Sequence, residues 1–81
     1  MNVQRLEMIR TLAQTYNTIL VSHRLTDAKT NSFEFTFKID FPITNGFLSN
    51  FEHEFKTHKI PMNNYRIENS FITVECIDLM R

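Results

Sequence analysis

The feature that most constrains this chain is an unbroken alternation of apolar and polar residues from Phe33 to Phe41. Every odd position carries phenylalanine or isoleucine, and every even position carries glutamate, threonine, lysine or aspartate. Successive side chains of a strand point to opposite faces, so the pattern predicts a strand over 32–41 with one buried and one solvated side. The fold must therefore contain a sheet that is covered on one face.

The remaining segments predict two helices and three further strands. Apolar residues recur at three- and four-residue steps over 3–16, which is typical of an amphipathic helix, and Asn2 is a suitable cap for its first turn. A second helix begins between Thr44 and Ser49 and ends near His58, because Pro61 forbids its continuation. The other strands are expected at 18–25, 64–68 and 71–78.

The last two strands predict a hairpin around Asn69-Ser70. A two-residue turn there pairs Glu68 with Phe71 and Tyr65 with Val74. A longer loop is the alternative, because Asn-Ser is a poorer turn than Asn-Gly. The same register places one apolar set on one face, namely Tyr65, Ile67, Ile72, Val74 and Cys76. For the first strand, strict alternation predicts an apolar face of Ile19, Val21, His23 and Leu25.

Together these segments predict an α+β fold with the order αββαββ. The 81 residues suffice for a single domain, 1–81, with no linker inside it. Its most economical arrangement is a four-stranded, mostly antiparallel sheet with both helices packed on the apolar face.

Charge and composition exclude several classes of function. Nine basic residues balance nine acidic ones, so the overall charge favours neither a nucleic-acid binder nor an acidic mimic of nucleic acid. The single glycine, Gly46, excludes a glycine-rich phosphate loop. The longest apolar run is three residues, from Ile19 to Val21, far below the ~20 that a membrane helix needs. We expect a cytoplasmic protein without a membrane contact.

No residue pattern indicates catalysis, a metal or a cofactor. His53 and His58 are five residues apart, whereas two ligands on one helix face are four apart. His23 on the apolar face is read as a structural histidine at the edge of the core, and Cys76 as a small buried hydrophobe. We therefore expect a protein that is not an enzyme.

The leading functional hypothesis is a small protein-binding module. Nearly all apolar residues are needed for the core, and the outer strands of a small sheet are natural docking edges. The partner is another protein or a second copy of the chain, which would make a homodimer. A composition rich in Asn, Phe, Ile, Thr and Lys is typical of AT-rich genomes, which makes a phage or mobile-element inhibitor of a host factor a candidate.

The competing hypothesis is an RNA- or DNA-binding module. It would use the polar sheet face, where Arg24, Lys38 and Arg66 are expected, together with Lys29 in the first hairpin loop. If the phenylalanines of the central strand were exposed, they could also stack on bases. We expect them inward instead, because a domain of this size has few other residues from which to build its interior.

Overall fold

The computed structural model describes residues 1–80, which form two helices and four strands. The first unit comprises α1 (Val3–Thr15), β1 (Ile19–Asp27) and β2 (Ser32–Lys38). The second comprises α2 (Asn45–Thr57), β3 (Met62–Glu68) and β4 (Phe71–Ile77). The predicted αββαββ order is confirmed.

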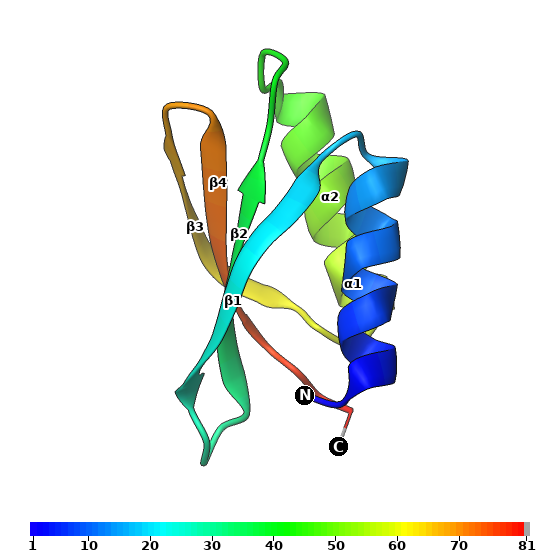
Figure 1. The fold of residues 1–81 in the computed structure, drawn as a ribbon, viewed down its shortest axis with the longest axis vertical. Helices are drawn as coiled ribbons and strands as arrows, with labels where there is room; N and C mark the ends of the chain where they lie inside the picture. The colour runs from blue at the N-terminus through cyan, green and yellow to red at the C-terminus, as the bar shows by residue number, and fades with distance from the viewer. Residues whose placement is uncertain (81) are drawn as a thin grey trace.

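The four strands form one sheet in the order β1-β2-β4-β3, and every neighbouring pair is antiparallel. Both helices lie side by side on one face of this sheet, and the other face has no helix over it (Figure 1). The predicted α+β architecture is therefore correct. No helix among residues 1–80 is both long enough and apolar enough to cross a membrane.

Both helices begin at a side-chain cap. The Asn2 carboxamide oxygen accepts a hydrogen bond from the Arg5 amide at 2.8 Å, as the sequence predicts. Thr44 caps α2, because its hydroxyl oxygen accepts from the Phe47 amide at 3.1 Å. The earlier of the predicted starts for the second helix is thus the correct one.

The alternation that predicted β2 also places the core. Phe33, Phe35 and Phe37 are buried on the helix-facing side, as is Ile39 just beyond the strand. Strand pairing stops at Lys38, three residues before the predicted end, because β1 and β4 both reach their last partner there, at Ile19 and Phe71.

Aromatic rings join β2 to α2. The ring of Phe37 meets Phe51 and Phe55 edge-on, with centroid distances of 5.2 and 5.9 Å. Phe51 also stacks on Phe47 at 5.3 Å and meets Tyr16, the C-cap residue of α1, at 5.6 Å. Edge-on and stacked pairs of this kind add ~0.5–1.5 kcal/mol each beyond the apolar area that they bury. The inward placement of the phenylalanines is confirmed.

Strand β1 departs from the predicted facing. A bulge between Leu20 and Ser22 inserts Val21, so the side chains before it are shifted by one position. Leu20, opposite Phe37, packs on the core, whereas Ile19 pairs with Lys38 on the polar face. The prediction that Ile19 shares a face with His23 is therefore wrong, because strict alternation cannot anticipate an inserted residue.

The second hairpin has the predicted register. Glu68 pairs with Phe71, Ile67 with Ile72, and Tyr65 with Val74, around the turn at Asn69 and Ser70. Asn69 has φ of 56°, a left-handed conformation that asparagine adopts more readily than most residues.

Candidate docking surfaces

The open face of the sheet carries the predicted cationic residues, but their charges are balanced. The Nε of Arg24 on β1 lies 3.1 Å from one Glu34 carboxylate oxygen, and Nη1 of Arg66 on β3 lies 3.7 Å from the other. Arg66 reaches Glu34 diagonally across β4, where Glu75 is a second carboxylate beside Glu34. The two arginines therefore converge on an acidic centre and form no basic patch.

The two predicted lysines lie at opposite ends of β2. Lys38 is its last residue, between Ile19 on β1 and Phe71 on β4. Lys29 lies in the β1–β2 turn, where its backbone amide donates to an Asp27 carboxylate oxygen at 3.0 Å. The structure thus brings Arg24 and Arg66 together on Glu34 and leaves both lysines apart from them.

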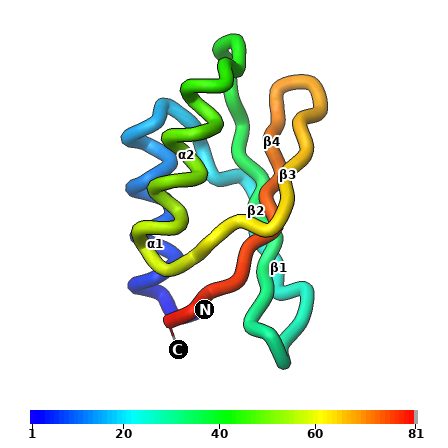
Figure 2. Tube along the Cα trace, turned by 180° about the vertical axis from the view of Figure 1, so that it is seen from behind, coloured from blue at the N-terminus to red at the C-terminus, as the bar shows by residue number. Residues whose placement is uncertain are grey.

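Strand β3 has an apolar face that the helices do not cover. Tyr65 and Ile67 are 42% and 43% exposed, whereas their partners across the strand pair, Val74 and Ile72, are 0% and 1% exposed. Helix α2 contacts β3, and Met62 at the start of the strand packs on the core. Toward its turn, the β3–β4 hairpin diverges from α2 (Figure 2). Sequence reasoning placed Tyr65 and Ile67 on the correct face, yet it could not show that this end lacks cover.

The two outer strands, β1 and β3, differ in regularity. Each pairs with a single neighbour within residues 1–80. Strand β1 has two register shifts, at Leu20/Ser22 and Leu25/Asp27, and such irregularities hinder the addition of another strand. Strand β3 has one shift, near Met62, and then pairs regularly from Asn64 to Glu68. The outer side of β3 is therefore the better template for a further strand.

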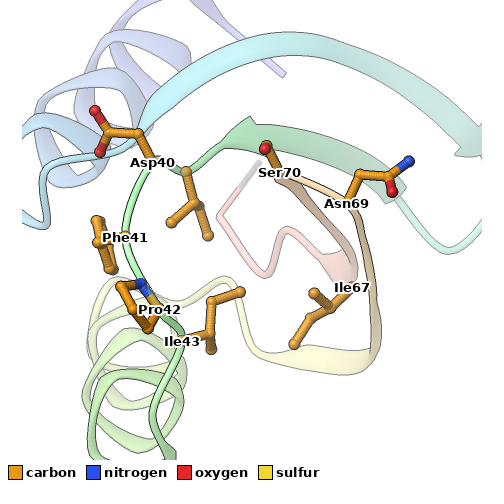
Figure 3. A pocket seen from close by; sticks show the side chains of 8 residues that line it. Asp40, Phe41, Pro42, Ile43, Ile67, Asn69 and Ser70 are labelled. Atoms are coloured by element: carbon orange, nitrogen blue, oxygen red, sulfur yellow. The ribbon is translucent and has the colours of Figure 1, made fainter.

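A groove adjoins the exposed end of β3 (Figure 3). Ile67 and Ile43 lie on opposite sides of it, and the groove is open to solvent with a volume of about 610 Å³. The Ile39 amide donates to the Ser70 carbonyl at 2.7 Å, which ties the segment after β2 to the β3–β4 turn. The lining residues are Ile39, Asp40, Phe41, Pro42, Ile43, Ile67, Asn69 and Ser70. The lining combines five apolar residues with Asp40, Asn69 and Ser70, so the groove can receive both apolar and polar side chains of a docked segment.

Two of the histidines, the residue type best suited to catalysis or metal binding, lie at the end of a helix and on an outer strand. His58 is the C-cap residue of α2, and its Nδ1 lies 2.8 Å from the Glu54 carbonyl oxygen. His23 lies opposite Phe35 with ring centroids 6.4 Å apart, on the helix-facing side as predicted, but it is exposed because β1 is an outer strand. In the part of the chain from 1 to 80, no three His, Cys, Asp or Glu residues are grouped so as to hold a metal ion.

Cys76 is buried on β4. Burial raises the pKa of its thiol to about 12, and the negative charge of the nearby Asp78 adds to the shift. A reactive cysteine needs a lowered pKa and access to solvent, and Cys76 has neither.

A buried ion pair between Arg5 and Asp78 joins helix α1 to the segment after β4. The Arg5 guanidinium donates to an Asp78 carboxylate oxygen and to the His58 carbonyl oxygen, both at 2.8 Å. The side chains are only 16% and 1% exposed. Sequence reasoning missed this pair, although an aspartate directly after an apolar strand was a usable signal. The pair fastens α1, the α2–β3 connection and the C-terminal segment together, which is a structural role.

Comparison with known proteins adds no further constraint. No protein-family model, curated protein or solved structure matches the chain. Its function is therefore argued from β3 and the adjoining groove. Strand β1 also exposes apolar residues, Ile19, Val21 and Leu25, but its two register shifts interrupt its outer side, whereas β3 combines exposed apolar residues with regular pairing.

Proposed function

We propose that this chain is a non-catalytic protein-binding module that receives an extended segment of its partner along β3. The observation that carries the proposal is the exposure of Tyr65 and Ile67 beside the regular outer side of β3. A strand added at such an edge gains main-chain hydrogen bonds, and its alternate side chains reach the apolar face. The groove between Ile67 and Ile43 would receive further side chains of the same segment.

The balanced charge of the open sheet face supports a protein partner over a polynucleotide. Affinity for nucleic acid comes largely from cations that neutralise phosphates. Here Glu34 already neutralises Arg24 and lies close to Arg66. Composition alone supports the narrower proposal that the partner is a host factor inhibited by a phage or mobile-element protein.

The experiment compares two isoleucines on the two outer strands. Ile67 on β3 and Ile19 on β1 are both exposed, at 43% and 63%, so each is replaced by aspartate in an immobilised chain. Proteins retained from a cell lysate by the wild type should also be retained by Ile19→Asp and lost with Ile67→Asp. Retention by all three proteins, or equal loss with both variants, would contradict docking at β3.

A second measurement addresses nucleic acid directly. Fluorescence anisotropy of labelled single-stranded DNA and RNA at low salt should show no binding by the wild type. Salt-dependent binding that disappears in the triple variant Arg24→Glu, Lys38→Glu, Arg66→Glu would replace the proposed function with nucleic-acid recognition.

A further inference from the structure

We infer that the segment received by β3 is β3 of a second copy, so that two chains form one continuous eight-stranded antiparallel sheet. The inference rests on the proposed docking function of β3 and names its partner. It follows from the order of three residues on this strand: Arg66, Ile67 and Glu68. A two-fold axis at Ile67 makes this triplet complementary to itself.

The faces of β3 set the geometry of such a pair. Two antiparallel strands related by a two-fold axis perpendicular to the sheet keep the same face toward the helices, so residues directly opposite each other share a face. With the axis at Ile67, Arg66 lies opposite Glu68 of the second copy, and Glu68 lies opposite its Arg66. Both contacts fall on the open face of the sheet, because Arg66 pairs with Thr73 and Glu68 with Phe71 there. Opposite charges in this position stabilise a strand pair.

The same register covers the exposed apolar residues. Ile67 would lie against Ile67 of the second copy on the helix-facing side, and Tyr65 would lie beside this pair, opposite Asn69 of the second copy. Both are exposed in the single chain, although their partners Val74 and Ile72 are buried. Pairing therefore removes from water the apolar surface that the helices leave open.

Neighbouring registers are less favourable. An axis at Arg66 would place two arginines directly opposite each other, which destabilises a strand pair. An axis at Tyr65 would place Ile67 opposite Asn63, which lies within the register shift of β3. The outer side of β1 offers no equal alternative, because its two shifts interrupt the strand. Charge and regularity thus select the register at Ile67.

The test uses charge reversal with rescue. Arg66→Glu and Glu68→Arg each place like charges opposite one another twice per dimer, and each should raise the dissociation constant roughly tenfold or more in sedimentation velocity at several concentrations. An equimolar mixture of the two variants restores both opposite-charge contacts, so the mixed dimer should form about as tightly as the wild-type dimer. Differently tagged variants, purified together through one tag, identify the mixed dimer. Circular dichroism of each variant shows that it is folded.

The outcomes separate the inference from the proposed function. A wild-type dimer that single reversal weakens and mixing restores supports self-pairing at Ile67. A wild-type dimer that neither reversal weakens overturns it. A chain that stays monomeric, yet retains another protein in an Ile67-dependent manner, overturns self-pairing and leaves docking at β3 intact. A monomer that retains nothing overturns both.

Discussion

Helices α1 and α2 each contain 13 residues, yet their buried positions carry side chains of very different size. At the seventh residue α1 has Ile9 and α2 has Phe51, and at the eleventh α1 has Ala13 and α2 has Phe55. All four are completely buried. The two helix–hairpin units therefore share an order of elements and differ in how much of the core each helix supplies.

The strands show the opposite bias. Strands β2 and β4 are both seven residues long, and their fourth residues, Phe35 and Val74, lie directly opposite each other. The two units are thus related by an approximate two-fold axis through this pair. The first unit gives the core its aromatic strand, and the second unit gives it the aromatic helix. Large side chains face small ones across the axis, which lets an interior rich in phenylalanine reach dense packing.

The largest expected effect follows from this difference between the helices. Phe51→Ala should lower the free energy of unfolding by ~3–5 kcal/mol, because it removes a fully buried ring and leaves a cavity between the neighbouring aromatic rings. Ile9→Ala at the matching position of α1 should cost less, about 2–3 kcal/mol. Urea denaturation followed by circular dichroism measures both. Val3→Ala, at an exposed position, is the control. Equal losses of unfolding free energy for Phe51→Ala and Ile9→Ala would contradict the proposed difference between the two helices.

The residues that follow the two central strands sharpen the comparison. Ile39 after β2 is buried among apolar groups, whereas Asp78 after β4 is buried in the ion pair with Arg5. Asp78→Ala should cost about 3 kcal/mol, because it leaves a largely buried guanidinium without its carboxylate. The double variant Arg5→Met, Asp78→Leu removes both charges and should recover most of that loss. A double variant as unstable as the single one would show that the backbone contacts of Arg5 matter more.

Sequence reasoning succeeded where a local pattern decides the structure. The alternation around Phe35 predicted which face of β2 is buried. The spacing of Tyr65 and Val74 around the Asn69-Ser70 turn predicted the register of the second hairpin. Both depend on side-chain periodicity within a few residues. The same locality explains why the start of α2 was narrowed to the interval from Thr44 to Ser49, which includes its cap, Thr44.

It failed where no periodic pattern marks a feature, either because the feature is an unsignalled insertion or because residues distant in sequence decide it. The bulge at Val21 is a local insertion without a glycine or proline to mark it. The Arg5–Asp78 pair joins the two ends of the chain, and the sharing of Glu34 by Arg24 and Arg66 depends on the strand order. The lack of cover over Ile67 depends on where α2 lies, which periodicity does not specify.

A smaller effect on stability, one that depends on pH, is expected from a comparison of the sixth residues of the two central strands, Phe37 on β2 and Cys76 on β4. Only the second of these can titrate. The folded thiol keeps its proton until about pH 12, whereas the thiol of the unfolded chain loses it near 9.0, so its contribution to stability is full below pH 9.0 and falls as the pH rises toward 12. In urea denaturation, Cys76→Ala should show a shallower decline of stability above pH 9.0 than the wild type. Parallel declines would contradict the shift.

The burial of Cys76 can also be tested by the rate at which its thiol reacts. A thiol reagent at pH 8 should modify Cys76 of the folded wild type only as fast as the chain opens, and immediately in urea. Rapid modification without urea would place the thiol at the surface, in conflict with its burial.

The smallest effect compares the two arginines that share Glu34. Arg24 on β1 approaches the carboxylate more closely than Arg66 on β3, at 3.1 against 3.7 Å, and both arginines are well exposed. Exposed ion pairs contribute ~0–1 kcal/mol, so at protein concentrations too low for a dimer to form Arg24→Ala should cost a few tenths of a kcal/mol and Arg66→Ala less, as measured by urea denaturation at low salt. Raising the salt concentration should narrow the difference, because solvent-exposed charges are screened. At concentrations where the proposed β3 dimer forms, Arg66→Ala should cost more than Arg24→Ala, and the excess should grow with protein concentration, because only association depends on concentration. A cost of Arg66→Ala that does not change with concentration would contradict β3 pairing through Arg66.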